Sequence, residues 1–569
     1  MKVLDVVKSS CQDCHRCLRS CEVGAIGFDE QAWIIEDKCI YCGTCVNICP
    51  QNSKKPYDMK GRLLKYIDNE EKVIVSLAPS YLTAYQDIEW YNIIGTLRAM
   101  GVDMITETAQ AAELVADYFN KEIKDRKKPL ISSCCPAVIN LIEKHYPEMR
   151  EYLADIVSPM NLHASLLKTK YGEKSRVVFI GPCIAKMDEM ESDRTESKVD
   201  AVITFYQFKK LCEENGIELN DHCSYQIEEG CGEISGTYPL ENGAVRASNL
   251  LSDYSQNEII SGNGVQNSQR ILTDLKEKKI APRFIELMAC EGGCINGPGV
   301  ENAASTVSKE IKVSQYAEKK DVKYNSHSLE KYLAEVDIKR NYKNRQKEYE
   351  EPTEAVIRSI LKEIGKETPE DETNCGGCGY DSCREKAIAV YHGLAQKNMC
   401  IPYMKSKAES LSHIIVESSH NAIIVVDKEM VIQEFNPVAD EMFGEHKVTE
   451  NGQKLADYID PHLFKEVWQT KDSIVHKKVE YEQYDLITEQ TIFPIEEYKV
   501  IVGIFSDITE RERQKKRVQE MKELAAEKAE DVVHQQMKIV QEIAGLLGET
   551  TVETKSALHE LTQLMQEEK

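Results

Sequence analysis

The first 57 residues contain eight of the twenty cysteines, and these eight repeat one spacing. Both runs read C-x2-C-x2-C-x3-C, and they consist of Cys11, Cys14, Cys17 and Cys21, and of Cys39, Cys42, Cys45 and Cys49. Gaps of two residues let three thiolates of one loop reach three corners of a 4Fe-4S cubane, while the fourth cysteine of each run serves the other cluster. The spacing therefore predicts two crossed ligand sets, Cys11, Cys14, Cys17 and Cys49 for one cluster and Cys39, Cys42, Cys45 and Cys21 for the second.

A pair of zinc sites is the alternative for this head, because zinc also binds C-x2-C pairs. Zinc needs only four ligands per site and does not require a doubled four-cysteine run, so we favour iron–sulfur clusters. Residues 1–57 resemble the two-cluster bacterial ferredoxins. One position departs from that family, because Glu22 stands where a proline usually follows the fourth cysteine, whereas Pro50 is retained in the second run.

Four later cysteines have a different spacing, C-x2-C-x4-C-x16-C, in Cys375, Cys378, Cys383 and Cys400. Three close thiolates followed by a helix and a returning fourth suit one further 4Fe-4S cluster. Zinc is again the alternative, since four cysteines suffice for it. Residues 353–405 resemble the small iron–sulfur domain found in electron-transfer and corrinoid-protein subunits.

Three more cysteine motifs lie far apart in the chain, SSCCPAV at 132–138, GPCIAKMDE at 181–189 and ELMACEGGCINGPG at 286–299. Any single one of these cysteines could be an ordinary buried thiol. Together the motifs resemble the three signatures of the iron-only (FeFe) hydrogenases, and the resemblance covers roughly residues 70–337.

That resemblance implies an H-cluster, in which four cysteines hold a 4Fe-4S cubane and one of them bridges to a two-iron unit with carbon monoxide, cyanide and a dithiolate. The implied ligands are Cys135, Cys183, Cys290 and the bridging Cys294. Cys134 would pass protons to the dithiolate, and Lys186 would hold a cyanide by a charge-assisted hydrogen bond. The implied contacts of the two-iron unit are Ala78, Pro79, Ser80 and Met288. Glu113 is a candidate for the proton path, and a solvated glutamate on a helix face is its alternative.

Several positions depart from the catalytic members of that family. Val138 replaces a tryptophan, Gly181 a methionine and Ala154 a serine of the proton path, and residues 297–301 read GPGVE instead of GGGQP. These changes remove a hydroxyl relay and packing around the two-iron unit, so we expect slow proton delivery. An enzyme of high turnover would keep such a relay, whereas a sensor does not need it.

The chain is too long for one hydrophobic core at 569 residues, and its net charge of −24 disfavours binding to nucleic acid. Hydrophobic residues make up 42% and charged residues 29%, which is typical of soluble globular domains. No apolar run resembles a signal peptide or a membrane span, so we expect a cytoplasmic protein, whose thiols stay reduced and bind metal.

Short β-rich runs at 73–79, 176–182 and 200–205 alternate with helical segments such as 111–124, which is the rhythm of an α/β domain. Residues 338–352, IKRNYKNRQKEYEEP, are nearly all polar. We expect a solvated linker or an exposed helix there.

Residues 409–510 resemble a PAS domain, in AIIVVDKEMVIQEFNPVADEMFG near the start and VGIFSDITERERQ at the exit. In that family the first helix would begin near Asn436. Residues 511–569 repeat apolar residues near heptad spacing, which predicts a long helix or coiled coil with a break near Gly548. No glycine-rich nucleotide-binding boxes of a histidine kinase follow His534, so we expect an ordinary surface histidine there.

The predicted fold class is multidomain α+β and α/β, with a ferredoxin-like cluster domain, an α/β H-cluster domain, a small 4Fe-4S domain, a PAS domain and a C-terminal long helix. We expect a hydrogen or redox sensor that binds or slowly oxidises H2 and exchanges electrons with a partner such as ferredoxin. The alternatives are a catalytic hydrogenase and a 4Fe-4S scaffold without the two-iron unit. A downstream phosphatase or kinase and a homodimer through the C-terminal helix are the other expected partners. Cys212, Cys223 and Cys231 receive no role beyond buried or surface thiols.

Overall fold

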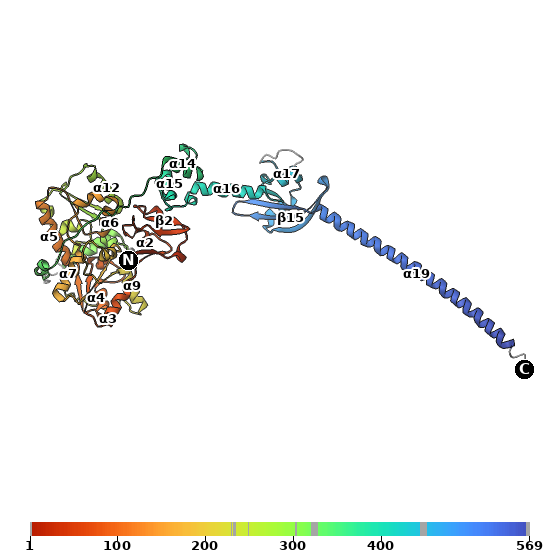
Figure 1. Cartoon of the computed structure of the whole chain (residues 1–569), viewed down its shortest axis with the longest axis horizontal. Helices are drawn as coiled ribbons and strands as arrows, with labels where there is room; N and C mark the ends of the chain where they lie inside the picture. Colours follow the sequence, from red (N-terminus) through yellow and green to blue (C-terminus); the bar gives the residue numbers. More distant parts are fainter. Residues whose placement is uncertain are drawn as a thin grey trace. The chain divides into compact units, whose positions relative to one another are not determined.

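The computed structural model describes residues 3–228, 230, 235–248, 250–255, 257–301, 304–319, 328–443 and 452–564. Contacts within the chain divide it into two compact units, Met1–Met404 and Lys405–Lys569 (Figure 1). Cys231 lies outside the described residues. Each described helix is either too short or too polar to cross a bilayer.

The N-terminal head of the first unit is built from two small antiparallel pairs. Strand β1 (Leu4–Val6) pairs with β4 (Lys54–Pro56), and β2 (Ile26–Asp29) pairs with β3 (Gln31–Ile34). The short helices of the head each begin within a cysteine run, and they are α1 (Arg16–Arg19) and α2 (Thr44–Asn47). Cys17, Cys39 and Cys45 are buried. Thiols therefore occupy part of the core of this small domain.

Two parallel sheets form the centre of the first unit. The larger has the order β6-β5-β8-β9 and the smaller the order β10-β11-β7. Their strands are β5 (Val73–Leu77), β6 (Met104–Glu107), β7 (Leu130–Ile131), β8 (Arg176–Gly181), β9 (Ala201–Thr204), β10 (Ile259–Asn263) and β11 (Phe284–Met288). Every residue of β5, β9 and β11 is buried, as is typical of parallel strands covered on both faces. The strands predicted at 73–79, 176–182 and 200–205 are confirmed.

Helices pack around these sheets: α3 (Lys60–Asp68), α4 (Trp90–Ala99), α5 (Ala109–Asp125), α6 (Pro136–His145), α7 (Pro159–Tyr171), α8 (Ala185–Glu191), α9 (Phe205–Glu214), α10 (Gly243–Ala247), α11 (Leu250–Asp253), α12 (Val265–Lys276) and α13 (Thr306–Lys319). The helix predicted over 111–124 is confirmed by α5. Helices α6 and α7 each begin with a proline, whose fixed φ suits the first helical position. Because Pro136 starts α6, this helix begins directly after Cys135.

Residues 338–345 do not form the solvated linker or exposed helix that their polar sequence predicts. Their backbone is hydrogen-bonded to the α/β domain: Arg340 N donates to Asp155 O at 3.0 Å, and Asn341 N donates to Arg194 O at 3.0 Å. Arg340 is only 2% exposed. The charged residues of this segment are paired with carboxylates of the domain, so a polar sequence here forms a docked segment. We call residues 338–345 the strap.

The strap leads to a small module built on α14 (Glu354–Glu363) and α15 (Cys383–Tyr391). Ile357, Leu361 and Ala387 form its core. The module contacts the head, because Phe28 N donates to Leu394 O at 3.0 Å. Helix α16 (Ile401–Glu417) begins directly after Cys400.

The second unit contains an antiparallel sheet of order β13-β12-β16-β15-β14. Its strands and helices are β12 (Ala422–Asp427), β13 (Ile432–Phe435), α17 (Pro437–Phe443), α18 (His462–Thr470), β14 (Ile474–Tyr481), β15 (Leu486–Ile495) and β16 (Val500–Asp507). Asn436 fixes the start of α17, because its Oδ1 accepts from Ala439 N at 3.0 Å and from Ile423 N at 2.8 Å. A helix beginning near Asn436 is therefore confirmed.

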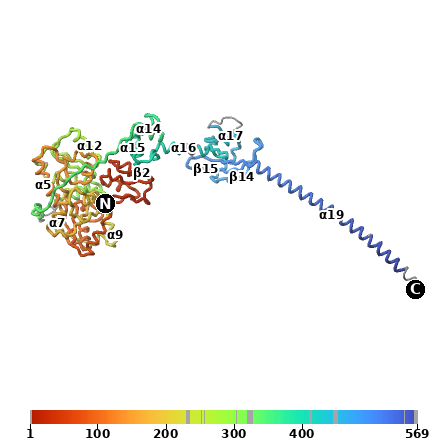
Figure 2. The backbone as a smooth tube through the Cα atoms, in the orientation of Figure 1, coloured from red at the N-terminus to blue at the C-terminus, as the bar shows by residue number. Residues whose placement is uncertain are grey.

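Helix α19 (Thr509–Leu564) is continuous, and Figure 2 shows it as one unbroken helical tube. The break expected near Gly548 is therefore wrong. Apolar side chains along α19, among them Val533, Val540 and Leu547, are exposed.

Candidate functional site

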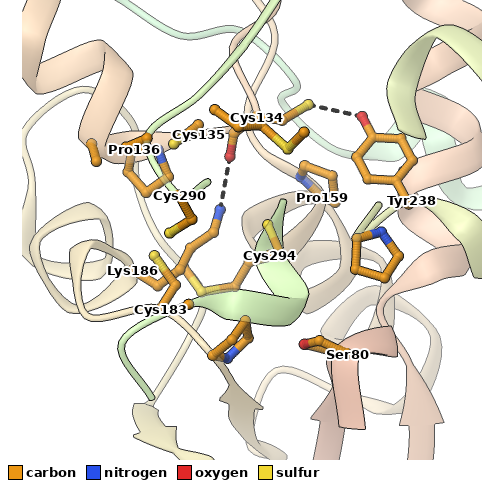
Figure 3. A pocket seen from close by; sticks show the side chains of 18 of the residues that line it. Ser80, Cys134, Cys135, Pro136, Pro159, Cys183, Lys186, Tyr238, Cys290 and Cys294 are labelled. Atoms are coloured by element: carbon orange, nitrogen blue, oxygen red, sulfur yellow. Dashed lines mark hydrogen bonds between the residues drawn. The ribbon is translucent and has the colours of Figure 1, made fainter. Parts of the chain in front are cut away.

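The loops that follow four parallel strands meet at one pocket of about 120 Å³. Ala78 follows β5, Ser132 follows β7, Pro182 follows β8 and Ala289 follows β11, and all four line the pocket. The carboxyl ends of parallel strands are where α/β folds place their ligands. Figure 3 shows five of the cysteines that line this pocket, Cys134, Cys135, Cys183, Cys290 and Cys294.

Four of these thiols converge although they come from three distant motifs. Burial raises the pKa of Cys290, and the neighbouring thiols of Cys294, Cys183 and Cys135 raise it further. Burial also raises the pKa of Cys183 to about 12. Thiols that are this hard to ionise without a cation suit a bound metal centre, because a metal ion stabilises thiolates. The four side chains therefore fit the cubane of an H-cluster.

The fifth cysteine, Cys134, has a different surrounding. Its Sγ lies 2.9 Å from the hydroxyl of Tyr238, with which it shares a hydrogen bond (Figure 3). Burial raises the pKa of Cys134 to about 12, although Tyr238 and the charge of Lys186 act to lower it. This thiol therefore stays protonated at neutral pH.

Lys186 reaches the same pocket from α8. Its Nζ donates to the carbonyl oxygen of Cys134 at 3.4 Å and to Glu189 Oε2 at 2.6 Å. Burial alone would raise the pKa of Glu189, but the charges of Lys186 and Arg340 outweigh it and hold this pKa at about 2. The carboxylate is therefore ionised, and it fixes the ammonium group at the pocket wall.

The other sequence-predicted residues fall into two groups. Ala78, Pro79, Ser80 and Met288 line the pocket. Glu113 lies outside the set of described residues that line it, on α5, where it accepts a hydrogen bond from Ser235 Oγ at 3.5 Å. Cys212 is buried in α9, and Cys223 is exposed.

Two of the positions at which the sequence departs from the catalytic members, Ala154 and Gly181, are closely packed. Ala154 is fully buried, and its carbonyl oxygen accepts from the hydroxyl of Tyr342 at 2.6 Å. At Gly181 the ring of Phe179, which lines the pocket, occupies the space that a side chain would take. The pocket wall is therefore packed without the serine and the methionine of the catalytic pattern.

The thiols of the head form two groups, and each group contains members of both cysteine runs. The pKa of Cys17 is raised by burial and then by Cys11, Cys49 and Cys14, with Lys54 acting to lower it. The pKa of Cys45 is raised by burial and then by Cys42, Cys39, Cys21 and, least, Cys17. The neighbours of Cys17 and Cys45 thus follow the crossed ligand sets.

The second of these groups adjoins the pocket. Cys42 lines the pocket and also raises the pKa of Cys290. Gly43 permits this approach, because its φ is +83° and because a Cβ at this position would collide with the ring of Pro298. The head is therefore docked with its second cysteine run against the pocket.

The small module gathers its own four thiols around a buried lysine. Cys375, Cys378, Cys383, Cys400 and Lys386 line one cavity. Lys386 is 1% exposed, and its Nζ donates to Gln396 O at 2.7 Å. Burial lowers the pKa of Lys386, while the thiols of Cys378, Cys400 and Cys383 raise it. The four thiols and one cation suit a cluster whose thiolate ligands carry negative charge.

The cysteine loop of this module meets the first cysteine run of the head. Gly379, between Cys378 and Cys383, has a φ of +87°, and a Cβ there would collide with the side chain of Leu18. Gln396 Nε2 also donates to Asp29 Oδ1 at 2.9 Å. Two predicted cluster loops are therefore in direct contact.

Three residues of the pocket region carry little signal in the sequence. Tyr238 has no motif around it, and Arg340 lies in a segment that reads as a linker. Glu286 had a detectable sign, because it is a single carboxylate within the buried strand β11. It lines the pocket and accepts from the N–H groups of Ala244 and Val245 at 3.1 and 3.2 Å.

Comparison with known families identifies three segments of the chain. Residues 71–298 match the model described as the iron only hydrogenase large subunit, C-terminal domain. Residues 32–55 match a 4Fe-4S binding domain, and residues 371–402 match a putative Fe-S cluster segment. Residues 71–298 are therefore a FeFe-hydrogenase-like large-subunit domain, and residues 32–55 carry a ferredoxin-like 4Fe-4S motif.

Similar proteins include hydrogenases and cytosolic Fe-S cluster assembly factors. The NADP-reducing hydrogenase subunit HndD of Solidesulfovibrio fructosivorans is 26% identical over 325 residues, which are 46% of this chain and 55% of that protein. The cytosolic Fe-S cluster assembly factor narfl of Danio rerio is 23% identical over 343 residues, which are 48% of this chain and 83% of that protein. This chain thus spans little more than half the length of HndD. Among solved structures, a variant of the FeFe-hydrogenase HydA1 from Chlamydomonas reinhardtii is 16% identical and covers 51% of this chain and all of its own, with a TM-score of 0.40.

Proposed function

We propose that this protein is a hydrogen or redox sensor that carries an H-cluster in the cysteine-lined pocket. The observation that supports the proposal is the convergence of four partly buried cysteines with Cys134 and Lys186 in one pocket. Cys135, Cys183, Cys290 and Cys294 would hold the cubane, with Cys294 as the bridge. When bound, the two-iron unit supplies the metal at which dihydrogen is cleaved heterolytically.

The chain's own residues would hold the proton and the charge of this reaction. Cys134 holds a proton at Sγ, and the hydroxyl of Tyr238 is its hydrogen-bond partner. Lys186 places a positive charge at the pocket wall, where it would bind a small anionic ligand such as cyanide. The lining of the pocket is mostly apolar, which strengthens both interactions.

Three further 4Fe-4S clusters would exchange electrons with the pocket. Cys42 of the second head group adjoins Cys290, and Leu18 of the first cysteine run meets Gly379 of the small module. These contacts support a linear order, in which electrons pass between the pocket, the second head cluster, the first head cluster and the cluster of residues 375–400. A redox partner such as ferredoxin would exchange electrons with this series.

A sensing role is supported by a missing hydroxyl. Ala154 offers none where catalytic members carry a proton-path serine. We infer that residues 409–510 act as a PAS domain and that residues 511–569 signal to a phosphatase or kinase. This coupling requires that reduction of the clusters favour one of two arrangements of residues 409–569.

A catalytic ferredoxin-linked hydrogenase is the second candidate, and the retention of Cys134 and Lys186 favours it. The test is to mature the full chain anaerobically, add H2, follow cluster reduction by EPR and measure turnover. A sensor reduces its clusters under H2 but turns over about 100-fold more slowly than a catalytic control, since a lost acid–base relay costs at least that factor. Equal turnover would show a catalytic enzyme. In a Cys294→Ala control, H2 should not reduce the clusters. If H2 also fails to reduce the clusters of the wild type, the protein is a redox scaffold without the two-iron unit.

A further inference from the structure

The strap brings a buried arginine behind the residues that line the pocket. Arg340 Nη1 donates to Glu189 Oε1 at 2.6 Å, and both side chains are fully buried. The same nitrogen donates to the carbonyl oxygen of Ser133 at 3.4 Å, one residue before Cys134. The strap lies outside residues 71–298, so Arg340 is an addition to the segment that matches the hydrogenase model.

Glu189 connects Arg340 to Lys186. Its Oε2 accepts from Lys186 Nζ at 2.6 Å and from Ser158 Oγ at 3.0 Å, while its Oε1 accepts from Arg340. The orientation of the carboxylate is thus fixed from both sides. Because Lys186 is held by this carboxylate, its position at the pocket depends on Arg340.

The charges of this buried network do not cancel. Lys186 and Arg340 carry two positive charges, and Glu189 carries one negative charge. A surplus buried charge is unfavourable unless an opposite charge faces it. In addition, Nε and Nη2 of Arg340 have no hydrogen-bond partner among the described residues. An anionic group bound in the pocket would balance this surplus.

We propose that Arg340 is a positioning residue of the pocket: through Glu189 it holds Lys186 against an anionic two-iron unit, and it ties docking of the strap to the presence of that unit. The inference rests on the proposed function, because it assumes the two-iron unit. The strap continues along the chain into the small 4Fe-4S module. A change in the charge of the pocket would therefore affect the module through the strap as well as through the clusters.

The first test uses the full chain with its 4Fe-4S clusters but without the two-iron unit. Arg340→Met removes the charge and keeps the length of the side chain. Hydrogen exchange should become about tenfold faster at the amides of residues 340 and 341 and within α8, because the loss of the hydrogen bonds from Arg340 Nη1 to Glu189 and Ser133 outweighs the relief of the surplus charge; a tenfold factor is typical of coupled sites. Lys339→Met is the matched control, because Lys339 also lies in the strap but pairs with Asp155 at 2.6 Å on the surface. It should leave exchange in α8 unchanged.

The second test uses the fully matured chain. Arg340→Met should shift the cyanide stretching bands in the infrared spectrum, Arg340→Lys should shift them less, and Lys339→Met should leave them in place. In the wild type the strap amides should exchange more slowly once the two-iron unit is present. Unshifted bands in Arg340→Met, equal shifts in Lys339→Met, or strap exchange that ignores the two-iron unit would each overturn the proposal. If the wild type shows no cyanide bands, the proposed function fails, whereas the first test still decides whether Arg340 positions Lys186.

Discussion

The thiol of Cys134 and the phenol of Tyr238 share a hydrogen bond of 2.9 Å inside the pocket. The next residue, Pro239, accepts a hydrogen bond at its carbonyl oxygen from Cys294 N at 2.8 Å. One dipeptide therefore contacts both the thiol that would hold a proton and the cysteine that would bridge to the two-iron unit. Any movement of this dipeptide would alter both at once.

Removing the hydroxyl of Tyr238 should change the thiol and leave the packing intact. Tyr238→Phe keeps the ring and removes one hydrogen bond, which contributes about 1 kcal/mol. Because the hydroxyl acts to lower the pKa of Cys134, this pKa should rise in the variant. If the S–H group donates to the phenol oxygen, its stretching band, assigned by its loss in Cys134→Ala, should move to higher frequency. An unmoved band would show that the thiol does not donate to Tyr238 in solution.

The contact between the head and the small module is tested by a matched pair of glycines. Gly379 and Gly376 both have positive φ, +87° and +67°, so an alanine at either position carries a similar backbone cost of about 1–2 kcal/mol. Only at Gly379 would the new Cβ collide with Leu18, since nothing lies within 4 Å at Gly376. Gly379→Ala should therefore separate the module from the head, and Gly376→Ala should not.

Two measurements detect the separation of the small module from the head. The amide of Phe28, which donates to Leu394 O, should exchange faster in Gly379→Ala. Magnetic coupling between the neighbouring reduced clusters should weaken in its EPR spectrum. Identical behaviour of the two alanine variants would contradict a docked module.

Crossed ligation of the head predicts a pattern of iron loss. Cys49 lies in the second run but neighbours Cys17 of the first. Cys49→Ala combined with Cys11→Ala should therefore lose the iron of one cluster, because both substitutions affect the same site. Cys49→Ala combined with Cys39→Ala should lose the iron of two. Iron per chain, measured after anaerobic reconstitution, distinguishes the two cases, and the reverse pattern would show that each run binds its own cluster.

Glu286 should titrate near neutral pH. Burial raises the pKa of Glu286 from 4.5 to about 7, although the N–H groups of Ala244 and Val245 lower it. The folded chain then binds more protons than the unfolded chain between these values, so stability falls as pH rises through this window. The loss amounts to about 3 kcal/mol above pH 7. Glu286→Gln, which stays neutral, should lack this loss.

The carboxylic-acid C=O band reports this titration directly. The infrared difference between wild type and Glu286→Gln should contain this band at pH 5 and lose it with a midpoint near 7. A carboxylate that is already ionised at pH 5 would contradict the raised pKa.

Local cysteine spacing predicted the ligand sets of the head, for a physical reason, whereas the ligands of the pocket were implied only by the resemblance of its three motifs. Two-residue gaps place thiolates on one tight loop, so the spacing itself encodes the geometry of a cubane. The parallel strands were equally accessible, because strands buried on both faces are short apolar runs such as 73–77. The loops after β8 and β11 carry Cys183 and Cys290, and both cysteines lie in motifs that are recognisable in the sequence.

The rest depended on contacts between distant parts of the chain. Arg340 reads as a linker residue, because its partner Glu189 is 151 residues away and no periodicity connects them. Tyr238 is recognisable only from its distance to Cys134, 104 residues earlier. The strap was therefore mistaken for solvated chain, since its charges find their counter-charges only in the folded domain.

The central claim is that the pocket holds a two-iron unit that responds to hydrogen. Its most direct test is an infrared spectrum of the anaerobically matured full chain in the carbonyl and cyanide region, recorded under argon and then under H2, with Cys294→Ala as control. The account predicts bands in the wild type that change reversibly with H2 and are absent from the control. A wild type without bands, under maturation that loads a known hydrogenase, would contradict it.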